Sequence, residues 1–197
     1  VRRYGGPLGL PLAVHTAFLV AQLGHLFPRN DWGHLVFALP AGASWPLPLY
    51  ELALLTSVHL ADAGASVALT LVTTEERPLQ LFGGAASEAV ADLLESHDIT
   101  LLTETTAFSF EGRSLRVLPD QSIEADRVVT LPRLEGPRLE GVPHDRNGFV
   151  PTDAHGHVRG LEAVYAAGDL TDFPVKQGGI ATQQADAAAE SIAAGTY

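Results

Sequence analysis

The order of apolar and polar positions predicts a strand, a helix and a second strand in the first half of the chain. Residues 34–39 are a short apolar run, typical of a buried strand. Residues 48–63 carry apolar side chains at helical spacing, and Pro48 suits the first turn of a helix. Residues 66–73 are rich in Val, Leu and Thr and predict the second strand. Two strands joined through a helix pair in parallel, so a parallel sheet is expected.

The pattern changes beyond the next helix and strand. Residues 86–96 predict another helix and residues 99–102 a third strand. Short alternating runs separated by turn residues then follow at 108–110, 115–117 and 126–131. These runs predict an antiparallel three-stranded meander. The expected class is therefore α/β, with a Rossmann-like central parallel sheet, the meander, and helices on the other face.

The last third of the chain is less regular. Residues 132–143 hold three prolines and two glycines and indicate a crossing segment. Residues 164–167 predict a last buried strand, and the Ala-rich residues 180–194 a closing helix.

The first residues suggest a helix that lies against something else. Residues 5–27 carry no formal charge, but Pro7 and Pro11 interrupt them and polar side chains lie among them, so a membrane span is disfavoured. An amphipathic helix over residues 12–27 is the expectation. No cleavage-site pattern of a signal peptide follows, which predicts a cytoplasmic protein. Weak contact with a membrane surface through this helix is the alternative.

Composition narrows the range of functions. The chain has 12 Lys and Arg and 23 Asp and Glu, a formal charge of −11, which argues against a nucleic-acid-binding surface. It has no Cys, which excludes disulfides, thiolate catalysis and Cys-ligated metals within it. It also has no Met and begins with Val1, which predicts a processed or excised segment of a larger protein.

The most specific chemistry lies after the predicted strand at 164–167. Gly168 allows a ligand close to the backbone, and the Asp169 carboxylate can accept hydrogen bonds from sugar-like hydroxyls. Gly178 and Gly179 open the last helix, where free N–H groups and the positive end of the helix dipole suit an electron-rich group.

The string from 160 to 185 resembles the second flavin fingerprint of the FAD-dependent pyridine nucleotide-disulphide oxidoreductase superfamily. The resemblance implies that Asp169 binds the ribityl chain of FAD and that the start of the last helix faces the pyrimidine side of the flavin ring. It also implies Lys176 as a cation beside the electron-rich edge of the flavin. The implied cofactor-binding residues are Ala167, Gly168, Asp169, Lys176, Gln177, Gly178 and Gly179; the catalytic residues stay unknown.

The resemblance extends over residues 34–195. Within the superfamily, residues 44–54 and 82–83 resemble sulfide:quinone reductase and type II NADH dehydrogenase relatives. It implies an NAD(P)-binding-like domain at 34–131 and the C-terminal part of an FAD-binding domain at 132–197. Residues 1–33 lie before the resemblance and are expected to be an N-terminal amphipathic helical segment.

The implied function is part of an FAD-dependent oxidoreductase that passes electrons from a reduced donor to an acceptor such as a quinone. The family's first flavin motif, Gly-x-Gly-x-x-Gly, is not found in the chain. We therefore expect an incomplete FAD site, a missing N-terminal flavin-binding half as partner, and a chain that alone is colourless, inactive and prone to self-association. The alternative is a non-catalytic relic of a nucleotide domain that serves binding or assembly.

Binding of NAD(P) is disfavoured by the turn after the first strand. Residues 38–45 contain one glycine, and Trp45 stands where a pyrophosphate would need space. Glu75 or Glu76, past the second strand, could meet a ribose. The lack of Cys beside the flavin also speaks against sulfide oxidation.

A metal site is a further hypothesis, weighed on Asp153, His155 and His157. A His-x-His pair with a third ligand can bind zinc or copper. A solvated turn is the preferred interpretation, and no metal is expected.

Overall fold

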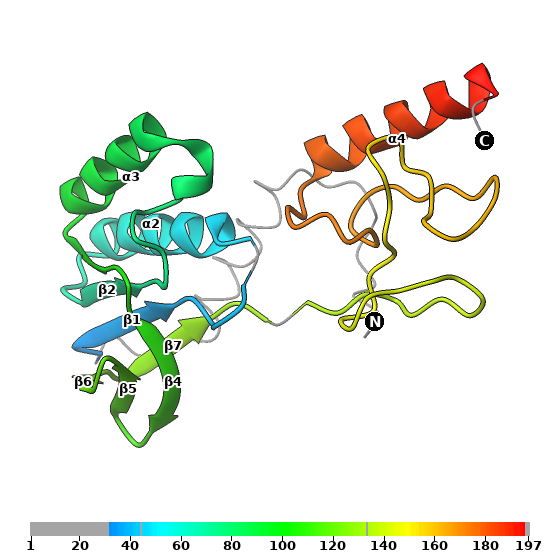
Figure 1. Cartoon of the computed structure of the whole chain (residues 1–197). Helices are drawn as coiled ribbons and strands as arrows, with labels where there is room; N and C mark the ends of the chain where they lie inside the picture. Colours follow the sequence, from blue (N-terminus) through cyan, green and yellow to red (C-terminus); the bar gives the residue numbers. More distant parts are fainter. Residues whose placement is uncertain (1–31, 44, 133, 196–197) are drawn as a thin grey trace. The chain divides into compact units, whose positions relative to one another are not determined.

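The described residues form two compact units. A computed structural model describes residues 32–43, 45–132 and 134–195, and they divide at residue 133. We call residues 32–132 the first unit and residues 134–195 the second unit; Figure 1 shows their elements. The helix expected over residues 12–27 lies outside the described residues.

The first unit is built on a parallel sheet. Its strands are β1 (His34–Ala38), β2 (Ala68–Val72), β3 (Ile99–Leu102) and β7 (Arg127–Thr130), in the order β3-β2-β1-β7. Every neighbouring pair in this sheet runs parallel. The α/β class with a central parallel sheet is therefore confirmed.

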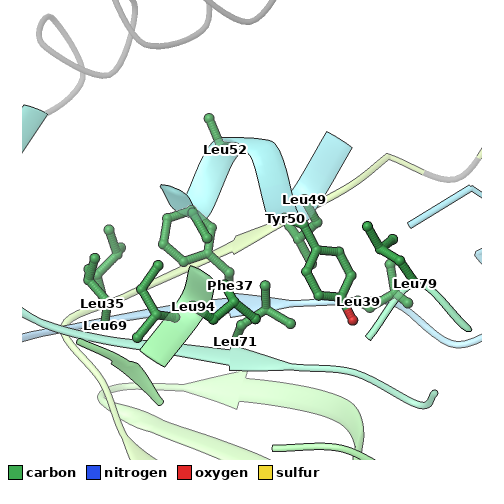
Figure 2. Packing of buried hydrophobic residues seen from close by; sticks show 12 residues of the cluster. Leu35, Phe37, Leu39, Leu49, Tyr50, Leu52, Leu69, Leu71, Leu79 and Leu94 are labelled. Atoms are coloured by element: carbon green, nitrogen blue, oxygen red, sulfur yellow. The ribbon is translucent and has the colours of Figure 1, made fainter. Parts of the chain in front are cut away.

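Two helices cover one face of this sheet, namely α2 (Leu47–Asp62) and α3 (Gly84–Ser96), as Figure 1 shows. A short 3-10 turn, η1 (Gln80–Phe82), precedes α3. Leu35 and Phe37 of β1 point into this layer and are buried. Figure 2 shows the apolar cluster, which comprises Leu35, Phe37, Leu39, Leu49, Tyr50, Leu52, Ala53, Leu69, Leu71, Leu79, Leu94 and Ile99.

The meander covers the opposite face. It consists of β4 (Thr106–Glu111), β5 (Ser114–Leu118) and β6 (Gln121–Glu124), paired antiparallel in chain order. Val36 and Ala38, which alternate with Leu35 and Phe37 along β1, pack in a second cluster with Leu115 and Val117 of β5. The strand at the centre of the sheet is thus buried on both faces.

One strand of the meander was predicted in the wrong place. Residues 126–131 contain β7, which lies in the parallel sheet, and the third meander strand is β6. Asp126 gives the physical reason, because its carboxylate accepts hydrogen bonds from the backbone N–H groups of Gly33 and His34, at 2.8 and 2.9 Å. These bonds hold the start of β7 beside the start of β1.

The second unit consists of loops and one helix, α4 (Gly178–Ala194). The strand predicted at 164–167 is reduced to a single bridge between Tyr165 and His157. The backbone bonds that flank it run from Val158 N to Val164 O and from Ala166 N to Gly156 O, each 2.8 Å. The segment that pairs with it, residues 156–158, has three residues and forms no continuous strand.

Candidate functional site

The turn before α4 is fastened to the helix by a hydrogen bond. The backbone N–H of Gly168 donates to the side-chain oxygen of Gln184, at 2.7 Å. Gly168 has a φ of +83°, and a Cβ built on it would lie 3.4 Å from the Cβ of Ala181. The positive φ therefore favours a glycine here, and a Cβ would be in ordinary contact with α4. Asp169, the next residue, is exposed.

The start of α4 is capped by a side chain and open to solvent. Gln177 is extended, with φ −147° and ψ 137°, and its side-chain oxygen accepts from the backbone N–H of Ile180 at 3.3 Å. Gly178 and Gly179 are exposed, and a Cβ built on Gly178 would meet nothing within 4 Å. A ligand can therefore reach the backbone at the positive end of the helix dipole.

Lys176 connects the loop before α4 to two other parts of the second unit. Its ammonium lies 4.1 Å from the centre of the Phe149 ring and donates to the backbone carbonyl of Thr171. The Thr171 hydroxyl in turn donates to the carbonyl of Gly168, at 2.9 Å. Burial lowers the pKa of Lys176. Three carboxylates oppose that shift, those of Asp145, Asp169 and Asp172.

These contacts bring the seven expected residues into two adjoining segments, 167–169 and 176–179. Ala167 is half-buried, and the chain of bonds from Lys176 through Thr171 links the second segment to Gly168. Sequence reasoning missed Gln184, Thr171 and Phe149 as supporting residues. Gln184 stands in the string at 160–185, but nothing in a local pattern assigns it to an amide 16 residues earlier.

The turn after β1 is built differently. Trp45 is 7% exposed and packs edge-on against the ring of Phe82, with 5.7 Å between the ring centres. Glu75, considered for a ribose, accepts a hydrogen bond from the Tyr50 hydroxyl at 2.7 Å. Of the two glutamates considered for a ribose, Glu76 is exposed and Glu75 is engaged, and the turn after β1 carries one glycine, Gly42, where a dinucleotide cradle carries several.

Asp153 serves as the acceptor of a turn. Its Oδ1 accepts from the backbone N–H groups of His155 and His157, at 2.9 and 3.0 Å. Among the residues that the structure describes, no group of three or more His, Asp or Glu side chains is arranged to hold a metal ion.

A family model described as pyridine nucleotide-disulphide oxidoreductase matches residues 51–191. This chain belongs to the pyridine nucleotide-disulphide oxidoreductase family. The resemblance on which the flavin expectations rest is thereby confirmed. Membership of this oxidoreductase family favours a redox function over a non-catalytic relic.

Solved structures share the fold of this family member. Sulfide:quinone oxidoreductase from Aquifex aeolicus superposes with a TM-score of 0.68 at 21% identity, over 92% of this chain and 48% of that chain. The reduced CoADR-RHD of Bacillus anthracis gives 0.61 at 15%, over 89% and 32%. An FAD-dependent pyridine nucleotide-disulphide oxidoreductase from Desulfovibrio vulgaris gives 0.56 at 19%, over 93% and 47%.

The chain spans about half, or less, of the length of these three proteins. Comparison with curated proteins gave no match. Within the described ranges, none of the helices combines the length and the apolar character needed to cross a membrane.

Proposed function

We propose that this chain is part of an FAD-dependent oxidoreductase that passes electrons from a reduced donor to an acceptor such as a quinone. The observation that carries the proposal is the exposed Asp169 in a turn that Gln184 fastens to α4, whose first two residues are glycines. Family membership supports the redox class. The quinone is suggested by the name of the Aquifex relative.

The residues of this turn fit a flavin nucleotide. The Asp169 carboxylate can accept hydrogen bonds from ribityl hydroxyls, since its side chain is exposed. The start of α4 offers backbone N–H groups and partial positive charge, which suit the electron-rich pyrimidine edge of the flavin ring. Gly178 and Gly179 permit that approach because a side chain would stand in the way. FAD supplies the electron-transfer chemistry, and these residues bind and orient it.

Lys176 has a supporting part in this proposal. Its ammonium is engaged with Phe149 and the Thr171 carbonyl, so it holds the loop in place. Its positive charge adds to the helix dipole at the same end of α4. Gln177 caps the helix, and Gly168 keeps the turn close to it through its bond to Gln184.

We further propose that residues 132–197 are the C-terminal part of an FAD-binding domain and that residues 34–131 form an NAD(P)-binding-like domain. The remaining contacts to FAD would come from a partner segment with a Gly-x-Gly-x-x-Gly motif. The division of the described residues into two compact units at residue 133 supports this domain boundary.

The test is flavin retention when the chain is produced together with such a segment. We expect a yellow complex, whereas the chain alone stays colourless. Asp169→Ala should weaken retention roughly tenfold or more, because a hydrogen bond to a charged group contributes about 1.5–3 kcal/mol. Asp186→Ala removes an exposed carboxylate from α4 and is the matched control. Equal retention in Asp169→Ala and the unmodified protein would contradict the assignment.

The acceptor is tested separately from the flavin site. In the yellow complex, reduced flavin should be reoxidised under anaerobic conditions by a short-chain quinone. Flavin that stays reduced would rule out the quinone and leave the flavin site standing.

A further inference from the structure

The edge of the first unit that could bind a nucleotide is defined by its topology. In parallel α/β sheets, ligands bind beyond the carboxyl ends of the strands. A dinucleotide needs N–H donors at a helix start, glycines that leave space for the pyrophosphate, and a carboxylate for a ribose. In the first unit the corresponding places are the start of α2, the turn after β1 and the loop after β2.

The start of α2 offers few donors. Pro46 is the N-cap residue and makes no side-chain capping bond, and Pro48 stands in the first turn. Neither proline has an N–H group. The N–H of Leu49 already donates to the carbonyl of Pro46, at 2.9 Å. Among residues 46–49 at the start of α2, the N–H of Leu47 is therefore the one backbone donor left for a pyrophosphate, where an open helix start has several.

Trp45 occupies the turn itself. Its side chain is 7% exposed, and its ring is held edge-on against Phe82. The indole N–H is buried without a hydrogen-bond partner among the described residues. A buried donor without a partner costs free energy, so the ring is held there by packing and not by polar contacts. An indole takes up the space that glycines leave open in a dinucleotide cradle.

Glu75 is engaged within the protein. It accepts from the Tyr50 hydroxyl at 2.7 Å and from the Thr73 hydroxyl at 2.9 Å. Tyr50 is 1% exposed. Burial, together with the bond to Glu75, raises the pKa of Tyr50, so the phenol stays a donor. Of the two glutamates after β2, Glu75 is thus engaged by a side chain of α2, whereas Glu76 is exposed.

The loop after β2 folds over the same edge. Leu79 is 3% exposed and lies in the apolar cluster. Figure 2 shows it beside Leu39, at the end of β1, and Tyr50. Phe82, three residues further along, covers Trp45. The loop therefore packs onto this edge through Leu79 and Phe82.

We propose that the first unit is closed to nicotinamide dinucleotides, with Trp45 in the place of the pyrophosphate and Tyr50 in the place of the ribose at Glu75. In the oxidoreductase proposed above, electrons would then reach the acceptor without NAD(P)H bound to the first unit. This proposal does not depend on whether the second unit holds a flavin.

The experiment uses Trp45 as the reporter. The chain has two tryptophans, so Trp32→Phe leaves Trp45 as the only one, and Trp45→Phe is the matched variant that reports Trp32. In Trp32→Phe we expect blue-shifted emission, and quenching by acrylamide several-fold weaker than for a free indole compound. ADP-ribose, which does not absorb the tryptophan emission, is then titrated into Trp32→Phe while that emission is followed. Binding of NADH and NADPH to the unmodified chain is measured separately by calorimetry.

The expected result is no saturable signal up to about 1 mM of any of the three compounds, the weak end of specific affinity. Saturable binding of ADP-ribose or NAD(P)H would overturn the proposal, as would a Trp45 that acrylamide reaches as readily as free indole. Calorimetry on the unmodified chain needs no variant to fold. Because Trp45 lies in the first unit, its emission separates binding there from calorimetric binding elsewhere in the chain, and a failed flavin assignment leaves this result intact.

Discussion

The two units differ in what holds them together. The first unit buries side chains on both faces of its sheet, in two apolar clusters. In the described part of the second unit, the buried side chains are Val150, Val158, Thr171 and Ala188. There the loops are joined mainly by hydrogen bonds, such as those from Val150 N to Leu170 O and from Asp172 N to Val150 O.

The first unit is a well-packed scaffold, whereas the second unit has few buried side chains and offers an exposed surface for a ligand. Most helical stability in proteins comes from packing of an apolar face, yet α4 buries only Ala188 and leaves Ile192 51% exposed. A ligand that binds the folded form stabilises it. We therefore expect the second unit to gain stability from FAD, whereas the first unit is already complete without a ligand.

The largest effect is expected in the core of the first unit. Phe37→Ala removes a fully buried ring from the central strand and should cost about 3–5 kcal/mol. Both tryptophans lie in the first unit, so denaturant unfolding followed by tryptophan fluorescence measures this loss directly. Val158→Ala in the second unit is the control and should leave that transition in place. An equal shift in both variants would mean that the two units unfold as one.

The next largest effect is expected from the hydrogen bond between Tyr50 and Glu75 in the first unit. Tyr50→Phe deprives Glu75 of its phenol donor and should cost about 1–3 kcal/mol, because the carboxylate stays partly buried. The same tryptophan-detected unfolding measures it. Glu76→Gln changes the exposed neighbouring carboxylate and should be neutral. A neutral Tyr50→Phe would show that the Tyr50–Glu75 bond is not part of what closes this edge.

Two glycines of the second unit should respond in opposite ways. Gly168→Ala introduces a side chain at a φ of +83° and should cost about 1–2 kcal/mol, seen as faster hydrogen exchange in α4. Gly178→Ala meets no atoms within 4 Å and should leave exchange unchanged or slower, since Ala is the better helix former. In the flavin complex, however, Gly178→Ala should weaken FAD retention. Unchanged retention would argue against a flavin at the start of α4.

The sequence predicts the parallel core well because its signals are local. An apolar run, a helix with proline in its first turn and a second apolar run define β1, α2 and β2 without any tertiary information. The third meander strand was missed because β6 reads Gln-Ser-Ile-Glu, with one apolar residue. Alternation along 126–131 indicates a strand but does not name its partner, which Asp126 selects through Gly33 and His34.

The sequence predicts the candidate site only for residues that belong to the flavin fingerprint at 160–185. Gly168, Asp169 and the two glycines that open α4 follow from the order of residues along the chain. The bond from Gly168 to Gln184 and the contact of Lys176 with Phe149 join positions 16 and 27 residues apart (184 − 168 and 176 − 149). They arise from how the loops close, which no periodicity encodes. The strand expected at 164–167 was wrong for the same reason.

The smallest effect concerns the junction of β1 and β7 and is seen in how the stability of the first unit depends on pH. Hydrogen bonds from the His34 and Gly33 backbone, with the Arg113 guanidinium 2.6 Å away, hold the pKa of Asp126 below its ordinary value of 3.8. A carboxyl whose pKa is lower in the folded state stabilises the fold above the unfolded-state pKa. That contribution is lost as the pH falls through the folded-state value.

Asp126→Asn should therefore lower the stability of the first unit at neutral pH and flatten its decline below about pH 4. Tryptophan-detected unfolding at a series of pH values from neutral to acid measures both changes. Asp120→Asn, an exposed aspartate in the turn between β5 and β6, is the matched control and should retain the full acid dependence. The opposite outcome is that the stability of Asp126→Asn falls in acid as steeply as that of the unmodified chain. In that case the hydrogen bonds of the sheet and the apolar clusters hold the junction, and the Asp126 carboxylate adds nothing to the stability of the first unit.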